Sequence, residues 1–246
     1  MIAVRLTLLA ISAAAVLAAF GATSAELQPS ARMVMVTSVI ALLAPLFWPG
    51  RAATSARTGL RVLGWSAAAA ALAALAAWLG PGASLPLPWI AKACVMLVLV
   101  SMVTHALAAG LEGLLRTRAG GADGARDMAG VAAVALLAML GALPLWFGPA
   151  AELLSHGNAR FLDATVGLSP LAHLAVASGN DLLRNQWFYE HSNLASLQFT
   201  YPELSALVTS YLVVLLALAL APMARQAARA RDGATPSTHS STEHAR

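Results

Sequence analysis

The chain has 246 residues, of which 59% are apolar and only 11% charged, and its mean hydropathy is +0.72. A soluble domain usually carries about 25% charged residues, so this chain has too few to cover a surface in water. The net charge of +4 comes from the arginines that orient a membrane chain and predicts no nucleic-acid partner. We therefore expect an integral membrane protein whose main partner is the lipid bilayer.

Six apolar runs, most of them long enough to cross a hydrocarbon core as a helix, follow one another along the chain. In lipid the backbone must satisfy its own hydrogen bonds, and the ten-residue alternation of barrel strands is absent from the sequence. The expected fold is all-α, a polytopic membrane bundle of about six transmembrane helices. The runs are 6–25, 33–48, 60–79, 89–115, 128–147 and 204–224.

The first run permits two interpretations. A basic start, an apolar centre and small residues before Glu26 are typical of a retained first helix and also of a secretory signal peptide. Cleavage after Ala25 would leave five spans and place the new N-terminus outside. The orientation of all later runs would be unchanged.

The positive charges alternate between the two sets of connections. Eleven lie at the chain ends or between runs two and three or four and five: Arg5, Arg51, Arg57, Arg61, Arg116, Arg118, Arg126, Arg225, Arg229, Arg231 and Arg246. Four lie on the other side: Arg32, Lys92, Arg160 and Arg184. Because positive loops stay in the cytoplasm, both termini are expected there, in the inner membrane of a bacterium.

Between runs five and six lies a long outer segment, 148–202, which we call the lid segment. The stretch "SPLAHLAVASGN" predicts a short helix with Ser169 as its N-cap, Pro170 at its first position and Gly179 at its end. A second short helix is expected directly after it. We expect both to be amphipathic helices lying on, or dipping into, the outer interface.

The stretch 180–203 gathers aromatic and charged residues that are scarce elsewhere in the chain. We expect it to pack as a lid across the outer ends of the bundle, although aromatic side chains at an interface are more often lipid anchors. Local ion pairing or capping equally explains its charges. The candidate lid residues are Asp181, Arg184, Trp187, Tyr189, Glu190, His191 and Tyr201.

A polar stripe interrupts the fourth run. Ser101, His105 and Glu112 are spaced by four and seven residues, which places them on one face of a helix. Ionisable groups within a span usually face the bundle interior or a water-filled path. The stripe is therefore a candidate substrate path or proton relay, or alternatively a histidine held by a neighbouring helix.

The sequence favours neither a cofactor nor a metal. A second span histidine for haem is missing, and His156, His173 and His191 are 17 and 18 residues apart, unlike compact zinc ligands. Nothing places Asp163 beside Asp181 or Glu190 as a hydrolytic pair. Phosphate loops, CxxC pairs and GxSxG elbows are also absent from the sequence. We expect no enzyme, and ATP would be used only through a partner.

Six spans, cytoplasmic ends and short helices outside between spans five and six resemble the permease subunits of ABC-2-type transporters. The resemblance implies a pair of identical or different permease subunits, a separate cytoplasmic ATPase, and outer helices that close the exit. Two features differ from the family pattern: the first span starts without a preceding interfacial helix, and "PGRAATSARTGLR" is short for a coupling helix.

Two functions are therefore expected. The first is a permease-like subunit of an exporter, and the second is a non-transporting anchor or assembly partner of an exported or respiratory protein. In either case residues 1–231 form the membrane domain, and the polar tail 232–246 is expected to be disordered in the cytoplasm.

Overall fold

The computed structural model describes residues 28–47, 56–79, 85–116, 122–146, 159–181 and 200–233. Within these ranges every regular element is a helix, so the expected all-α class is confirmed. The helices are α2 (Pro29–Phe47), α3 (Ala56–Leu79), α4 (Leu87–Leu115), α5 (Ala122–Gly141), α6 (Leu143–Trp146), α8 (Ala159–Gly167), α9 (Pro170–Ala177) and α11 (Leu204–Gly233).

Three of these helices, α4, α5 and α11, contain a stretch that is long and apolar enough to cross a membrane. The qualifying stretches are Leu87–Leu115, Gly124–Gly141 and Leu204–Ala221, and two shorter apolar stretches are Pro29–Leu42 and Gly59–Leu75. These counts cover the described part of the chain, and the first apolar run, 6–25, lies outside it. By length and composition, three described helices could therefore cross a membrane, and the apolar stretches of α2 and α3 are shorter.

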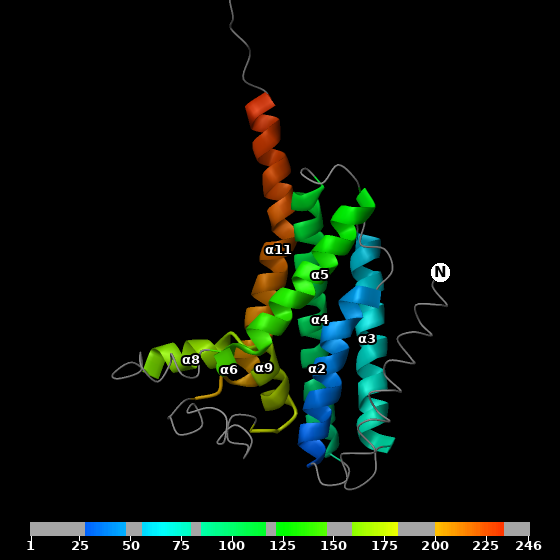
Figure 1. Ribbon diagram of the computed structural model, residues 1–246, viewed down its shortest axis with the longest axis vertical. Helices are drawn as coiled ribbons and strands as arrows, with labels where there is room; N and C mark the ends of the chain where they lie inside the picture. The colour runs from blue at the N-terminus through cyan, green and yellow to red at the C-terminus, as the bar shows by residue number, and fades with distance from the viewer. Residues whose placement is uncertain are drawn as a thin grey trace, which may run out of the picture.

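The helices α2, α3, α4 and α11 run roughly along the long axis of the molecule, and α5 crosses them obliquely (Figure 1). Helix α4 lies at their centre and packs against α2, α3, α5, α9 and α11. The helices α8 and α9 lie at one end, where α2, α4 and α11 begin (Figure 1). We call this end the α9 end, and the end where α3 and α5 begin the opposite end.

Small residues line the contacts of the central helices. On α5 the fully buried residues recur every fourth position, at Ala125, Ala129 and Ala133, and α5 packs against α4 and α2. In lipid the hydrophobic effect does not drive helices together. Helix packing depends instead on small side chains, which let the backbones approach closely. The buried alanines of α3 and α4 do the same, at Ala69, Ala70, Ala73, Ala93 and Ala108.

Helix α9 begins and ends where the sequence predicts. The Ser169 hydroxyl accepts a hydrogen bond from Ala172 N–H at 3.3 Å, and Pro170 is the first helical residue. At the other end Gly179 has φ +69°, and Asn180 N–H donates to the Ala175 carbonyl at 2.9 Å. This is a Schellman ending, which closes the last turn.

The surroundings of α9 differ from the expected amphipathic helix at an interface. Six of its eight residues are buried, and it packs against α2, α4, α5, α8 and α11. Its side chains Leu174 and Ala177 belong to the same apolar core as Met96 of α4 and Leu207 of α11. The helix is nearly uniformly apolar and therefore enters the bundle rather than lying on it.

Gly179 is required by two features at once. Its φ of +69° is strained for any residue with a Cβ, and a Cβ built there would lie 2.9 Å from the Trp89 indole. We expect Gly179→Ala to destabilise the protein by at least about 1 kcal/mol, which lowers the melting temperature by about 2–4 °C. Thermal unfolding in mild detergent measures this.

The matched control is Gly167→Ala. Gly167 is helical, and a Cβ built there meets nothing within 4 Å, so alanine should be neutral or slightly stabilising. Equal melting temperatures for the two variants would contradict the packing of Trp89 on Gly179.

Candidate functional site

The α9 end of the bundle contains a buried polar contact between α9 and α11. Nε2 of His173 lies 3.0 Å from the Gly167 carbonyl, and Nδ1 lies 3.0 Å from the Tyr211 hydroxyl. A carbonyl only accepts hydrogen bonds, so Nε2 carries the proton, and Nδ1 of the neutral ring accepts from Tyr211 O–H. The two rings also meet edge to face, with centroids 5.6 Å apart. His173 thus joins three elements, α8, α9 and α11.

The environment keeps His173 neutral. Its side chain is 5% exposed, and burial lowers its pKa from 6.5 to about 4, while the hydrogen bond with Gly167 opposes this shift. The neutral form satisfies both of its neighbours without a charge in the core. At physiological pH the contact is therefore an uncharged hydrogen-bonded link between α9 and the last long helix.

A second polar contact holds α9 to α5. The Ser169 hydroxyl, which caps α9, also donates to the Gly141 carbonyl at 2.9 Å. Gly141 is the last residue of α5, where carbonyl groups lack partners within the helix. One buried hydroxyl therefore satisfies backbone groups of two helices and fixes the start of α9 against the end of α5.

The candidate lid residues are described only in part. Tyr201 donates through its hydroxyl to Asp181 at 2.7 Å, and Thr200 N–H donates to Asp163 at 3.1 Å. Both contacts are exposed, and they tie the start of α11 to α8 and to the end of α9. These two bonds bring together the described ends of the stretch 180–203. Asp163 and Asp181 each accept a hydrogen bond from a different residue, Thr200 and Tyr201. The residues Arg184, Trp187, Tyr189, Glu190 and His191 lie outside the described residues.

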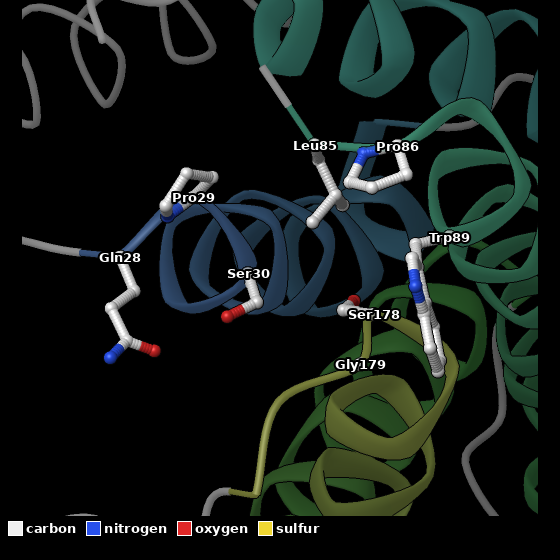
Figure 2. Close-up of a pocket in the computed structure, with 8 residues that line it drawn as sticks. All are labelled: Gln28, Pro29, Ser30, Leu85, Pro86, Trp89, Ser178 and Gly179. Carbon is white, nitrogen blue, oxygen red and sulfur yellow. The ribbon is translucent and has the colours of Figure 1, made fainter. Parts of the chain in front are cut away.

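Beside α9 lies a pocket of about 230 Å³, with Trp89 on one side and the first residues of α2 on the other (Figure 2). The Lys92 ammonium stands 4.4 Å from the centre of the Trp89 ring. Asn180 donates to the Ser30 hydroxyl at 3.1 Å and links the end of α9 to α2. The lining residues are Gln28, Pro29, Ser30, Leu85, Pro86, Trp89, Ser178 and Gly179.

The predicted polar stripe of α4 is buried as a face of the central helix. Ser101, His105 and Glu112 are 0%, 7% and 3% exposed. They do not form one cluster, because eleven residues separate Ser101 from Glu112, or about 16 Å along the helix. Glu112 pairs through Oε1 with Arg116 one turn later, while its Oε2 is buried without a hydrogen-bond partner among the described residues.

The Ser101 hydroxyl is likewise buried and has no partner within the described ranges. A buried hydroxyl or carboxylate oxygen without a hydrogen bond costs about 1–3 kcal/mol. The unpaired oxygens of Ser101 and Glu112 therefore destabilise the folded protein, and apolar residues at these positions would avoid this cost.

Metal ligands do not gather in the part of the chain that the structure describes: no group of three or more His, Cys, Asp or Glu is close enough to hold an ion. His156 and His191 lie outside it. His173, which the sequence offered only as a metal ligand, instead uses both ring nitrogens within the protein. Its place in an otherwise apolar short helix was the available signal, but its partner Tyr211 is 38 residues away.

Comparison of the chain with protein-family models, with curated proteins and with solved structures finds no match.

The lowered pKa of His173 predicts a loss of stability in acid. As pH falls from 6.5 to about 4, the unfolded chain takes up the proton before the folded one does. Stability should be at its full value above pH 6.5 and fall by up to about 3 kcal/mol toward pH 4. Melting temperatures in detergent between these pH values measure the slope.

His173→Gln should flatten this slope, since glutamine does not titrate. Tyr211→Phe removes the hydroxyl but leaves the buried imidazole, so it should lower stability and keep the slope. An identical slope in His173→Gln and the unmodified protein would show that His173 is not responsible.

Proposed function

We propose that this chain is the permease-like membrane subunit of an exporter that works with a separate cytoplasmic ATPase. The observation that carries the proposal is the burial of α9 among α2, α4, α5 and α11 at one end of the bundle. A short helix in that position occupies the route by which a substrate would leave between the spans. Passage then requires α9 to move, and its contacts decide which helices move with it.

The contacts of α9 support a role as a movable plug. It is linked to α5 by the hydrogen bond that Ser169 donates to Gly141 and to α11 by the one that His173 accepts from Tyr211. Its own caps keep it helical when it shifts as a unit. Displacement of α11 would pull on Tyr211 and through it on His173. A helix serving only as a docking surface would expose its side chains, whereas α9 buries them.

In the proposed topology the first run, 6–25, is one of six spans, α2 and α3 cross as short spans, and both termini are cytoplasmic in a bacterial inner membrane. The α9 end then faces outward. Within the described ranges the α9 end carries three positive residues and the opposite end carries seven. The three are Arg32, Lys92 and Arg160, and the seven are Arg57, Arg61, Arg116, Arg126, Arg225, Arg229 and Arg231. The positive-inside rule supports this orientation when the remaining arginines are counted with them.

The proposed partners are an ATPase and a second permease subunit. The proposal rests on a missing phosphate loop and on exposed apolar side chains of α11. Without a phosphate loop of its own, the chain needs an ATPase to drive export. Its outer helices between α5 and α11 resemble those of ABC-2-type permeases, which act as pairs. Large apolar side chains are exposed along α11 and suit lipid or a second permease subunit, among them Leu212, Val213, Leu216 and Leu220.

A non-transporting anchor for an exported or respiratory protein is the second candidate. The pocket beside Trp89 favours it, because a cleft of about 230 Å³ at the α9 end offers a place for a partner side chain. In that case α9 would be a fixed support beneath the docking surface.

The proposed orientation is tested with reporter fusions. A fusion after Arg118 should be active as a cytoplasmic reporter, and one after Asn193 should be active as a periplasmic reporter. The reason is the distribution of eleven arginines against four positive residues. The opposite pair of results would reverse the topology and place α9 at the cytoplasmic exit.

The plug is tested by locking α9 to α5. A Cβ built on Gly141 lies 3.8 Å from the Leu171 Cβ, which matches the spacing in disulfides. Gly141→Cys with Leu171→Cys, in a Cys94→Ala background, should therefore form a disulfide on oxidation. We expect an ATPase to copurify in mild detergent and its ATP hydrolysis to fall several-fold in the oxidised complex and recover on reduction.

The single-cysteine variants are the controls and should be insensitive to the oxidant. A complete disulfide with unchanged ATP hydrolysis would refute the moving plug. Copurification of a periplasmic or redox protein, with no ATPase, would favour the anchor.

A further inference from the structure

Hydroxyl groups within the described helices mostly share one arrangement, and two buried serines depart from it without any partner among the described residues. Most donate to a backbone carbonyl three or four residues earlier, the usual solution for serine and threonine in an apolar helix. These are Thr37, Ser38, Thr104, Ser178, Thr209 and Ser210. Ser66 of α3 and Ser101 of α4 are both 0% exposed, and their hydroxyls have no partner among the described residues.

The two exceptions lie on helix faces that point toward each other. The Cys94 thiol donates to the Ala70 carbonyl at 3.3 Å, which identifies the sides on which α4 and α3 meet. Ser101 follows Cys94 by seven residues, close to two turns, and Ser66 precedes Ala70 by four, close to one turn. The helices α3 and α4 run in opposite directions (Figure 1). The residue spacing therefore places both serines on the same side of this contact, toward the opposite end.

The same face of α4 continues to Glu112. His105 and Glu112 follow Cys94 by eleven and eighteen residues, close to three and five turns, so both align with it. We call this line of α4, with Ser66 of α3, the α3–α4 seam. At its far end Arg116, whose side chain is 47% exposed, holds Oε1 of Glu112 and leaves Oε2 buried without a partner.

We propose that the α3–α4 seam holds a chain of water that enters beside Glu112 at the opposite end and stops at Ser101 and Ser66. Water supplies the donors that Glu112 Oε2 needs and the hydrogen-bond partners that the two hydroxyls need. Beyond the serines the seam closes, since the Cys94 thiol bonds directly to the Ala70 carbonyl of α3.

The seam is thus a half-path, wet from one side only. That this side is the cytoplasm rests on the orientation in the proposed function, whereas the hydration itself does not. The proposal adds three features to the predicted stripe of α4. Ser66 of α3 faces it, water enters beside Glu112, and the water chain ends at Ser101.

Thiol labelling tests the half-path in the full chain. In a Cys94→Ala background, Ser101→Cys and Ser66→Cys each place one near-isosteric thiol on the seam. The probe is a membrane-impermeant cationic methanethiosulfonate, applied to inside-out and right-side-out vesicles. We expect both thiols to react from the cytoplasmic side about tenfold faster than a buried control, since a thiol must ionise in water to react.

The matched control is Val100→Cys, which is 1% exposed and neighbours Ser101 on another side of α4. The native Cys94 is a second control at the closed end of the seam. Variants are compared only when they elute at the position of the unmodified protein. Ala108→Cys, which is fully buried and follows Cys94 by close to four turns, replaces either serine variant that does not.

Labelling of the seam thiols at the rate of Val100→Cys would overturn the half-path. Fast labelling from the outside alone would keep the water but reverse its entrance, and with it the proposed orientation. Because the assay needs no ATPase and no transport, failure of the exporter proposal and failure of the half-path give different results.

Discussion

A short helix inside an apolar bundle must satisfy the backbone groups at both of its ends, and the arrangement of this molecule depends on how α9 does so. Ser169 closes its start and bonds to the last carbonyl of α5, and the Schellman turn at Gly179 closes its end. Because these bonds satisfy backbone groups at both ends of the helix, six of its eight residues can be buried among four long helices. Trp89 then packs on Gly179, where a larger residue would hold the indole away.

The same rule explains His173. A histidine in a buried helix would be costly if it were charged or unpaired, and here it is neutral with a partner on each nitrogen. The imidazole also connects α9 physically to α11, a helix that is otherwise largely exposed. Among the α11 side chains that the structure describes, the buried apolar ones are Leu207 and Tyr211. If α11 moves as proposed, its motion would reach α9 through few side chains.

The sequence predicted those features that are local and missed those that join distant segments. Run length and hydropathy located the described long helices, and Ser169, Pro170 and Gly179 located α9, because caps and turns act within a few residues. Its burial was missed since an apolar short helix fits an interface or a core equally well. The partnerships of His173 with Tyr211 and of Trp89 with Gly179 span 38 and 90 residues and leave no periodic signal. The stripe of α4 was visible, but Ser66 was not, as a lone serine among alanines has no pattern.

The central helix differs between its two halves, and this difference relates the plug to the seam. Toward the α9 end α4 packs through Ile90, Ala93, Met96 and Leu97 into the apolar core that includes α9. Toward the opposite end its face carries Ser101, His105 and Glu112 in line with Cys94. In the proposed exporter, a path that is polar from one side and closed at the other by apolar packing and α9 would have only one barrier to remove. Because α9 contacts α4, α5 and α11, a change in how these three helices pack would act on that barrier directly, while the polar half of α4 could remain in place.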